Sequence, residues 1–325
     1  MSEDALRVGV VGAGFIASLH VAAWSALGAQ VHIYSANGAT ELARRYGART
    51  VASPEVCVEQ ADVVDVCTPT TTHDEFVLAA AAAGRHVVCE KPLARDHQRA
   101  ERLISACGAA GVQLFPAHVV RYFPEYEAAH RLVGDGTIGQ IATMRLTRTT
   151  AMPTAPWFSD WELSGGLVID QMIHDFDFAR WMAGEVVQVF AKTGGDSAPI
   201  TAYALLQHES GAITQVSGGW GLPHTAFQTT YKIRGTLGGL DHDSASLPLR
   251  WDYADTAETR GGLLPDFDPV NSPYQRELSD FVQSISGGAQ PRVSAADSLA
   301  ALDIALAAEA SCRRGRPVDP KEMRQ

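Results

Sequence analysis

Three small residues near the start of the sequence have a spacing that is suited to binding phosphate. Gly12, Gly14 and Ala17 form the pattern G-x-G-x-x-A directly after an apolar run at residues 7–11. In this pattern the first glycine permits a tight turn, the second lets the backbone approach a pyrophosphate, and the small third residue allows close helix–strand packing. The N–H groups at the start of the following helix then bind the anion. The spacing therefore predicts a dinucleotide site.

The residues after the second predicted strand indicate which dinucleotide is bound. Folds that prefer NAD usually place an Asp or Glu there to bind the ribose hydroxyls. This sequence has no acidic residue after that strand until Glu41, whereas Ser35 and Asn37 are able to donate hydrogen bonds to a 2′-phosphate. Arg44 and Arg45 follow about one helical turn later and add positive charge. We therefore predict NADP(H) as the preferred cofactor, with NAD(H) as the alternative.

Residue types suited to proton transfer occur at two further places. Lys91 lies in the tripeptide E-K-P at residues 90–92, and Asp170 and His174 are four residues apart on a predicted helix. An imidazole transfers protons near neutral pH, and a lysine stabilises a developing negative charge. Each feature has a structural alternative, because Lys-Pro is common in turns and Asp–His pairs at this spacing are common surface contacts. A zinc site formed with His118 is disfavoured by the charge of Lys91, and we predict no metal.

The elements that must position these residues alternate regularly in the first third of the chain. Near-continuous apolar strands separated by helices indicate a parallel sheet covered on both faces. The predicted strands are 7–11, 30–34, 63–67, 86–89 and 112–117, and the predicted helices are 16–27, 40–46, 72–83 and 96–110. Ligands of such sheets lie beyond the carboxyl ends of the strands, where the motifs at residues 68–73 and 90–92 are expected to converge.

The second part of the chain has a different texture, in which consecutive strands are joined by glycine turns. This favours an antiparallel or mixed sheet. We expect helices at 124–133, 167–182, 273–286 and 295–312, strands at 140–151, 186–193, 200–208, 212–219 and 226–234, and loops at 152–162 and 253–270. The sequence thus predicts an α/β protein: a Rossmann domain with a doubly wound parallel sheet (residues 1–120) and a C-terminal α+β domain for substrate binding and oligomerisation (residues 121–325). The α+β domain is expected to have a mostly antiparallel open sheet, and the last helix is a candidate for packing back on the first domain.

The composition of the 325 residues excludes several classes of protein. Hydrophobic residues make up 46% and charged residues 19%, as in ordinary globular proteins and unlike disordered chains. The formal net charge of −11 repels a phosphate backbone, so we expect neither a nucleic-acid partner nor an anionic membrane. A local anion site is compatible with this charge, because a helix N-terminus attracts phosphate whatever the global charge.

The cysteines and the N-terminus indicate a reducing compartment. The five cysteines contain no C-x-x-C pair and lie mostly in apolar stretches, which is typical of buried thiols. The first residues are acidic and lack the basic and hydrophobic regions of an export signal. No apolar stretch approaches the roughly 20 residues of a membrane span. We therefore expect a cytoplasmic protein.

The order of the motifs resembles the Gfo/Idh/MocA oxidoreductase family, which includes glucose–fructose oxidoreductases and inositol dehydrogenases. The glycine loop is followed by T-P-x-x-x-H at 68–73, by E-K-P at 90–92 and by G-G-x-x-x-D-x-x-x-H-D at 165–175. The resemblance covers almost the whole chain. It implies an NAD(P)-dependent dehydrogenase or reductase that acts on a secondary alcohol or ketone of a sugar, a sugar derivative or a cyclitol.

The resemblance also implies roles for individual residues. In this family the lysine of E-K-P and the Asp and His of D-x-x-x-H are catalytic, and they correspond to Lys91, Asp170 and His174. The predicted cofactor contacts are Gly12, Gly14, Phe15, Ile16, Ser35, Asn37, Thr68, Pro69, His73, Glu90 and Lys91. The predicted substrate contacts are Lys91, Arg121, Tyr122, Trp157, Asp170 and His174. For His73 a buried structural role in its helix is an equal alternative.

Two departures from the family pattern bear on the substrate. Ser164 stands where many relatives have a third glycine, and Glu162 stands where many have arginine, so no particular relative's substrate is carried over. Two alternative functions use the same fold: a non-catalytic NAD(P)-binding regulator and an NAD-dependent glycosidase. The resemblance further implies a homo-oligomer, a dimer or tetramer, formed through the open face of the second sheet.

Overall fold

The structure is a computed structural model that describes residues 5–195, 198–246 and 272–324. Its chain divides into two compact units, one of Met1–Phe123 with Phe267–Ala300 and one of Pro124–Asp266 with Ala301–Gln325. The prediction divided the chain once, at residue 120, into two continuous domains. In the structure each compact unit is instead built from two separate segments of the chain. The segment that joins the first unit late in the sequence carries helix α10 (Pro273–Ile285), which packs against α1 (Phe15–Ala26). The loop predicted at 253–270 lies outside the described residues.

The first unit contains the predicted parallel sheet. Its six strands run in the order β3-β2-β1-β4-β5-β6, with every neighbouring pair parallel, which confirms the Rossmann prediction. The strands are β1 (Arg7–Val11), β2 (Gln30–Tyr34), β3 (Arg49–Thr50), β4 (Val63–Val66), β5 (His86–Glu90) and β6 (Leu114–Ala117). The sequence analysis missed β3, because a strand of two exposed residues has no hydrophobic pattern.

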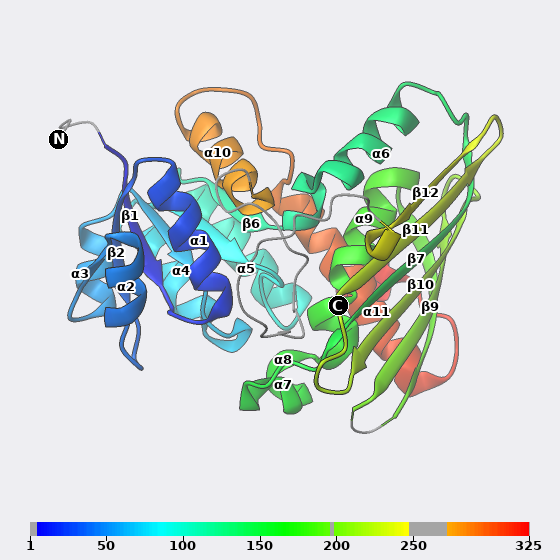
Figure 1. Ribbon diagram of the computed structural model, residues 1–325, viewed down its shortest axis with the longest axis horizontal. Helices are drawn as coiled ribbons and strands as arrows, with labels where there is room; N and C mark the ends of the chain where they lie inside the picture. The colour runs from blue at the N-terminus through cyan, green and yellow to red at the C-terminus, as the bar shows by residue number, and fades with distance from the viewer. Residues whose placement is uncertain (1–4, 196–197, 247–271, 325) are drawn as a thin grey trace. The chain divides into compact units, whose positions relative to one another are not determined.

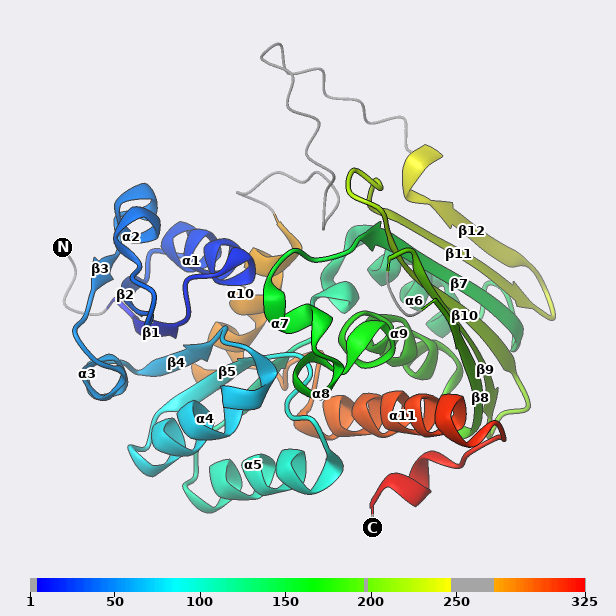
Figure 2. The same cartoon turned by 90° about the horizontal axis from the view of Figure 1, so that it is seen from below.

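Helices cover both faces of this sheet. Figure 2 shows α1 and α2 (Thr40–Tyr46) on one face and α3 (Pro54–Glu59), α4 (His73–Ala82) and α5 (His97–Ala109) on the other. The unpredicted α3 begins with Ser53, whose hydroxyl accepts a hydrogen bond from the Val56 N–H. Two short 3₁₀ turns, Thr70–Thr72 and Val119–Tyr122, follow β4 and β6. The loops that carry the predicted motifs follow the carboxyl ends of β1, β2, β4 and β5.

The second unit contains a six-stranded sheet in the order β12-β11-β7-β10-β9-β8. Only the β7–β10 pair is parallel, which confirms the mostly antiparallel prediction. The strands are β7 (Ile141–Ala151), β8 (Val186–Gly194), β9 (Ile200–His208), β10 (Ile213–Gly221), β11 (Gln228–Gly235) and β12 (Gly239–Asp243). The strand β12 was not predicted, because its five residues include no fully buried side chain.

Helices α6 (Pro124–Gly134), α9 (Ile173–Ala183) and the part of α11 (Ala295–Arg314) that belongs to this unit lie on one face of the sheet (Figure 1). On the other face, side chains of neighbouring strands are exposed: Phe190 38%, Tyr203 54%, Leu205 49% and Ile213 45%. The alternation of buried and exposed residues along β9 follows directly from the two-residue period of a strand. The predicted open face is thus present.

Two predicted elements of the second unit need correction. The loop expected at residues 152–162 contains the short helix α7 (Pro156–Ser159) and the start of α8 (Trp161–Ser164). The single helix expected at 167–182 is divided into a π-helical turn, Leu167–Gln171, and α9. A π turn contains one residue more than an α turn, and such turns occur often at functional sites. The hydrophobic period alone does not reveal this extra residue.

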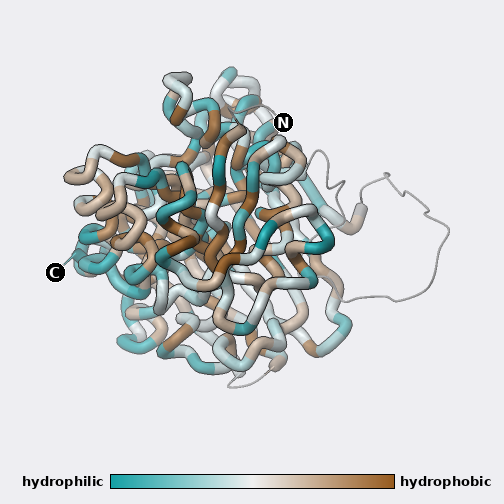
Figure 3. The backbone as a smooth tube through the Cα atoms, turned by 90° about the vertical axis from the view of Figure 1, so that its left-hand side faces the viewer, coloured by the Kyte–Doolittle hydropathy of each residue, from teal (hydrophilic) through white to brown (hydrophobic). Residues whose placement is uncertain are grey.

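Apolar residues fill the interior of each unit. Buried Val side chains line β1, β4 and β5, and hydrophobic stretches are prominent near the middle of the tube in Figure 3. Among the described residues, no helix combines the length and apolar character that crossing a membrane would require. The five cysteines are free thiols, and Cys57, Cys89 and Cys107 are buried.

Candidate cofactor and catalytic sites

The glycine loop has the geometry that a pyrophosphate needs. Gly12 has φ +117°, and a Cβ atom on it would lie 2.6 Å from the carbonyl oxygen of Cys67. Gly14 is the N-cap of α1, and a Cβ atom there would meet no atom within 4 Å among the described residues. The first N–H groups of a helix have no intrahelical acceptor, and here Phe15 and Ile16 begin the helix. Open space beside a helix N-terminus without a Cβ fits a dinucleotide phosphate.

The turn after β2 contains the residues predicted to select the dinucleotide. Asn37 is exposed, and its N–H donates to the Ser35 hydroxyl at 3.4 Å. Glu41, the first acid after the strand, pairs with Arg44 at 2.6 Å, and both side chains are largely exposed. The Arg45 guanidinium lies 5.3 Å from the centre of the Tyr46 ring. No carboxylate of this turn therefore stands directly at the carboxyl end of β2.

The motif after β4 forms a loop that is fastened by its histidine. Thr68 is half-buried and Pro69 exposed, and Thr72 donates a side-chain hydrogen bond to Thr68 at 2.8 Å. His73 is 1% exposed; its Nε2 lies 3.0 Å from the Thr68 carbonyl and its Nδ1 3.3 Å from the Leu93 carbonyl. The structure therefore favours the structural alternative for His73 over a direct cofactor contact. Its imidazole fixes the loop that presents Thr68 and Pro69.

The E-K-P motif lies at the carboxyl end of β5, the neighbour of β4. Glu90 is 7% exposed, and its Oε2 accepts a hydrogen bond from the Lys91 backbone N–H at 3.0 Å. Its Oε1 lies 3.2 Å from Nε2 of His20 on α1. Lys91 itself is half-buried. Glu90 is thus a buried structural carboxylate that holds the backbone of Lys91.

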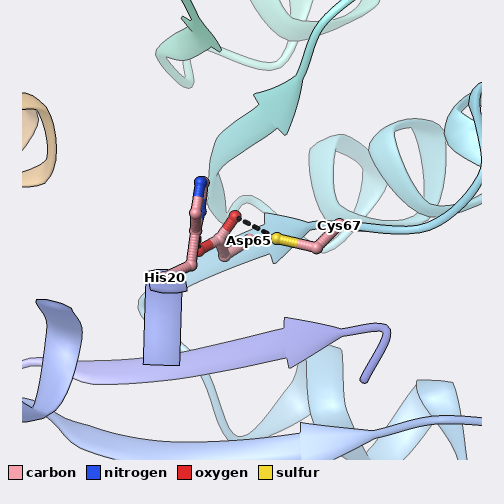
Figure 4. Close-up of side chains that lie close together, drawn as sticks. All are labelled: His20, Asp65 and Cys67. Atoms are coloured by element: carbon pink, nitrogen blue, oxygen red, sulfur yellow. Dashed lines mark hydrogen bonds and ion pairs between the residues drawn. The ribbon is translucent and has the colours of Figure 1, made fainter. Parts of the chain in front are cut away.

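A buried polar cluster contacts Glu90 of this motif through His20. His20, Asp65 and Cys67 come from α1, β4 and the residue after β4 (Figure 4). Oδ2 of Asp65 accepts from the Trp24 indole at 2.7 Å and lies 2.9 Å from His20 Nδ1, while the Cys67 thiol donates to its Oδ1. The three residues have atoms close enough to hold a metal ion. Because the His20 nitrogens already face Asp65 and Glu90, a hydrogen-bonded network explains the cluster without one.

The electrostatics of this cluster involve a third acid, Glu277, besides Asp65 and Glu90. Burial, the largest single influence, lowers the pKa of His20, but the charges and hydrogen bonds of Asp65 and Cys67 together outweigh it, so the pKa is raised well above the usual value. Glu277 on α10 is fully buried, and neither carboxylate oxygen has a hydrogen-bond partner among the described residues. Burial raises the pKa of Glu277 well above its usual value, and the charges of Glu90 and Asp65 add to the effect, although His20 opposes it. Both shifts favour the protonated form of the side chain, in His20 and in Glu277.

The structure does not support a substrate role for two predicted contacts. Arg121 is 2% exposed, and its guanidinium donates to the Arg292 carbonyl at 3.0 Å. Tyr122 is 1% exposed, and its hydroxyl donates to Asp280 at 2.7 Å. The Arg292 guanidinium covers the Tyr122 ring at 4.7 Å. Both predicted residues therefore stabilise the packing of the 3₁₀ turn after β6 against α10.

The predicted acid and histidine of the second unit lie on either side of the division between the π turn and α9. Asp170 is in the π turn, His174 is in the first turn of α9, and both are half-buried. Gln171, between them, is buried: its amide donates to the Arg148 carbonyl at 3.0 Å and accepts from the Thr150 hydroxyl at 2.9 Å. The α-helical face predicted for Asp170 and His174 is therefore replaced by a turn tied to β7.

The aromatic segment at residues 157–161, which precedes the π turn, is held in place by the hydrogen bonds of Ser164. Ser164 is fully buried; its hydroxyl donates to the Phe158 and Asp160 carbonyls and accepts from the Gly166 N–H at 3.0 Å. Glu162, the other departure from the family pattern, is exposed. Trp157 is half-buried, with its ring 3.9 Å from that of Phe158. Ser164 therefore fixes the loop that carries Trp157.

Sequence reasoning missed several residues that fix the sites: His20, Asp65, Arg148, Gln171 and Glu277. A usable signal existed for Asp65, because an acid within the apolar strand V-V-D-V must have a buried partner. A second signal was His20, a polar residue in an apolar helix. For Gln171 and Glu277 the sequence offers no such contrast, since each has both polar and apolar neighbours in an ordinary helical pattern.

Comparisons with known proteins match both parts of the chain. Residues 6–118 match the family described as "Oxidoreductase family, NAD-binding Rossmann fold", and residues 126–241 match the "GFO/IDH/MocA C-terminal domain". The chain is 28% identical to myo-inositol 2-dehydrogenase of Thermotoga maritima, over 98% of this chain and 99% of that protein.

Solved structures give the same result. The crystal structure of GenD2 from gentamicin A biosynthesis in complex with NAD aligns with a TM-score of 0.85 at 27% identity, over 97% of this chain and 96% of that one. Levoglucosan dehydrogenase in complex with NADH and L-sorbose aligns with a TM-score of 0.82 at 25% identity, over 97% and 98%. With both domains matched and the glycine loop in place, the chain belongs to the Gfo/Idh/MocA family of NAD-binding oxidoreductases.

Proposed function

We propose that this protein transfers a hydride between a nicotinamide dinucleotide and a secondary alcohol or ketone of a sugar, a sugar derivative or a cyclitol. The observation that carries the proposal is the open N-terminus of α1 behind Gly14, on a chain that also retains Lys91, Asp170 and His174. The nicotinamide supplies the hydride acceptor or donor when it is bound. The protein positions the substrate, supplies the positive charge beside the reacting oxygen and transfers the proton.

Each of the three polar residues has a distinct role in the proposed reaction. His174 removes the proton from the substrate hydroxyl during oxidation and returns it to the carbonyl oxygen during reduction. Asp170 orients the imidazole and stabilises its cationic form. The Lys91 ammonium donates a hydrogen bond to the substrate oxygen and stabilises the alkoxide that develops there. Trp157 offers an aromatic face to the sugar ring.

We propose NADP(H) as the preferred cofactor and NAD(H) as the alternative. Support comes from the turn after β2, where Ser35 and Asn37 stand in place of an acid and Glu41 is paired with Arg44. A carboxylate at position 35 would repel a 2′-phosphate. In Ser35→Asp we expect the ratio of NADP affinity to NAD affinity to fall. An unchanged ratio would contradict the NADP assignment.

The proposed setting is a cytoplasmic homo-oligomer, a dimer or tetramer. The exposed Phe190, Tyr203, Leu205 and Ile213 form the apolar patch of the open sheet, with a cavity lined by residues of β8, β9 and β10. An apolar patch on several strands is suited to burial against a second copy.

A substrate screen tests the proposed function. Purified protein is supplied with NADP or NAD and with myo-inositol, scyllo-inositol, D-apiose or levoglucosan, and the absorbance of the reduced nicotinamide is followed. We expect turnover with at least one compound, and a loss of about 10²–10⁴-fold in His174→Ala with cofactor binding retained. Lys91→Ala should lower kcat in the same way.

Other outcomes identify the alternatives. Bound cofactor without turnover of any compound would overturn the oxidoreductase proposal and favour a regulator. Release of a free sugar from a glycoside without net change in nicotinamide absorbance would favour a glycosidase. Turnover equal to that of the wild type in His174→Ala would overturn the role of this residue.

A further inference from the structure

A chain of buried hydrogen bonds connects His20 to the backbone of Lys91. Nδ1 of His20 lies 2.9 Å from Asp65 Oδ2, and Nε2 lies 3.2 Å from Glu90 Oε1. The other oxygen of Glu90 accepts from the Lys91 N–H at 3.0 Å. One carboxylate thus separates the imidazole from the amide of the proposed catalytic lysine.

The protonation of His20 follows from its surroundings. Both ring nitrogens face carboxylate oxygens, and only the imidazolium form is able to donate a hydrogen bond on both sides. The titratable groups around the ring are Asp65 and Cys67, Glu90 of β5, and Tyr274 and Glu277 of α10. The ring is completely buried, so exchange of its proton with water is unfavourable.

The contact with His20 restrains Glu90. A carboxylate with partners at both oxygens has no freedom to turn, and this one is 7% exposed. Without the imidazole, the Glu90 carboxylate would keep only its contact with the Lys91 N–H and would lie beside the Asp65 carboxylate with no group between them. Like charges in a buried cluster repel each other. The Glu90 side chain would then turn away, and the Lys91 amide would lose its acceptor.

We propose that His20 is a positioning residue for Lys91, acting through the Glu90 carboxylate. The effect on turnover rests on the proposed function of Lys91, whereas the structural link itself does not. Trp24 belongs to the same cluster, and its indole N–H donates to Asp65 and not to Glu90. It therefore provides a matched control.

Two substitutions of His20 test the contacts of its two ring nitrogens one at a time. The amide of Asn reaches the place of Nδ1, and the longer Gln reaches that of Nε2. His20→Asn should therefore keep the contact with Asp65 and lose that with Glu90, whereas His20→Gln should keep the contact with Glu90. Glu90→Gln replaces one of the two accepting oxygens of Glu90 by an amide group and leaves His20 in the sequence. This variant provides the test if His20→Asn does not fold.

The position of Lys91 is measurable without any substrate, because the sequence contains four lysines: Lys91, Lys192, Lys232 and Lys321. Labelling with ¹⁵N-lysine gives one backbone amide resonance for each, and Lys91→Arg identifies that of Lys91. We expect the Lys91 resonance to shift in His20→Asn and Glu90→Gln. It should stay near its wild-type position in His20→Gln and Trp24→Phe, and the other three resonances should not move.

Turnover then tests the consequence, with the best substrate of the screen. A displaced catalytic group costs up to about 10²-fold, so kcat should fall by about 10–100-fold in His20→Asn, with cofactor Kd and KM nearly unchanged. In His20→Gln, kcat should recover to within about tenfold of the wild type.

An unmoved Lys91 resonance in His20→Asn and Glu90→Gln, or equal shifts in both His20 variants, would overturn the positioning role. If the resonance shifts as expected but Lys91→Ala retains full turnover, the positioning of Lys91 stands and its proposed catalytic function fails.

Discussion

Arg148 on β7 and Asp175 on α9 form an ion pair with two hydrogen bonds, of 2.8 and 3.0 Å, and their side chains are only 6% and 2% exposed. Asp175 directly follows His174, so this pair fixes the first turn of α9 on the sheet. A buried pair gains little net stability over apolar residues, but breaking it leaves an uncompensated charge. The pair therefore orients His174, although its net contribution to the free energy of unfolding is small compared with that of an apolar pair.

Asp175→Asn should lower the stability of the protein strongly. It leaves the Arg148 charge buried without its counter-ion, and loss of one partner from such a pair costs about 3–5 kcal/mol. Asp241→Asn is the matched control, since its pair with Arg234 is half-exposed and worth less than about 1 kcal/mol. Thermal unfolding compares the two variants. Equal melting temperatures would show that the buried pair has no special role.

Alanine at the two loop glycines should separate folding from cofactor binding. Gly12→Ala places a Cβ atom 2.6 Å from the Cys67 carbonyl at φ +117°, so stability should fall by at least about 1–3 kcal/mol. Gly14→Ala meets no protein atom at a helical N-cap, so the melting temperature should hold while the Kd for the dinucleotide rises. Calorimetry and titration measure both quantities. An unchanged Kd in Gly14→Ala would place the cofactor elsewhere.

Glu277 should make the protein less stable as the pH rises. Burial raises its pKa in the folded protein, so above pH 4.5 the folded state binds more protons than the unfolded chain. Stability then falls with rising pH until the folded pKa is passed. Glu277→Gln removes this dependence, and we expect a gain of about 1–3 kcal/mol at pH 8 that shrinks toward pH 5. Denaturant unfolding at several pH values measures it, and a loss of stability in Glu277→Gln at pH 8 would contradict the raised pKa of Glu277.

Gln171→Leu should lower turnover and spare cofactor binding. The substitution removes the hydrogen bonds from the π turn to the Arg148 carbonyl and the Thr150 hydroxyl, so Asp170 and His174 lose their common support. Misplacement of catalytic groups on this scale costs up to about 10²-fold in kcat. Thr150→Val, which removes one of these bonds, should have a smaller effect. Wild-type kcat in Gln171→Leu would show that the turn is held by other contacts.

Leu205→Lys should disrupt the proposed oligomer. Leu205 is 49% exposed within the apolar patch of the open sheet, and burying a lysine at a subunit interface is unfavourable. Leu237→Lys is the control, because Leu237 is 78% exposed in the turn between β11 and β12, away from that patch. Light scattering after size-exclusion chromatography gives the masses. A wild-type protein that is monomeric at micromolar concentration would refute the oligomer itself.

The sequence alone determined the features that depend on local spacing. Alternating apolar strands and helices predicted the parallel sheet, and the position of Gly12 and Gly14 at a strand–helix junction predicted the anion site. These inferences hold because chain neighbours set turns, helix starts and the two-residue period of strands. Similar reasoning missed β3 and β12, whose few half-exposed residues carry no hydrophobic pattern.

The tertiary structure decided everything that depends on partners distant in sequence. Arg121 and Tyr122 looked like polar substrate contacts, but segments more than 150 residues away occupy their polar groups. His20, Asp65 and Glu90 are ordinary residues in the sequence, and packing of α1 against β4 and β5 makes them one buried network. Burial removes water as the alternative partner, so the identity of the neighbouring side chain fixes both charge and orientation.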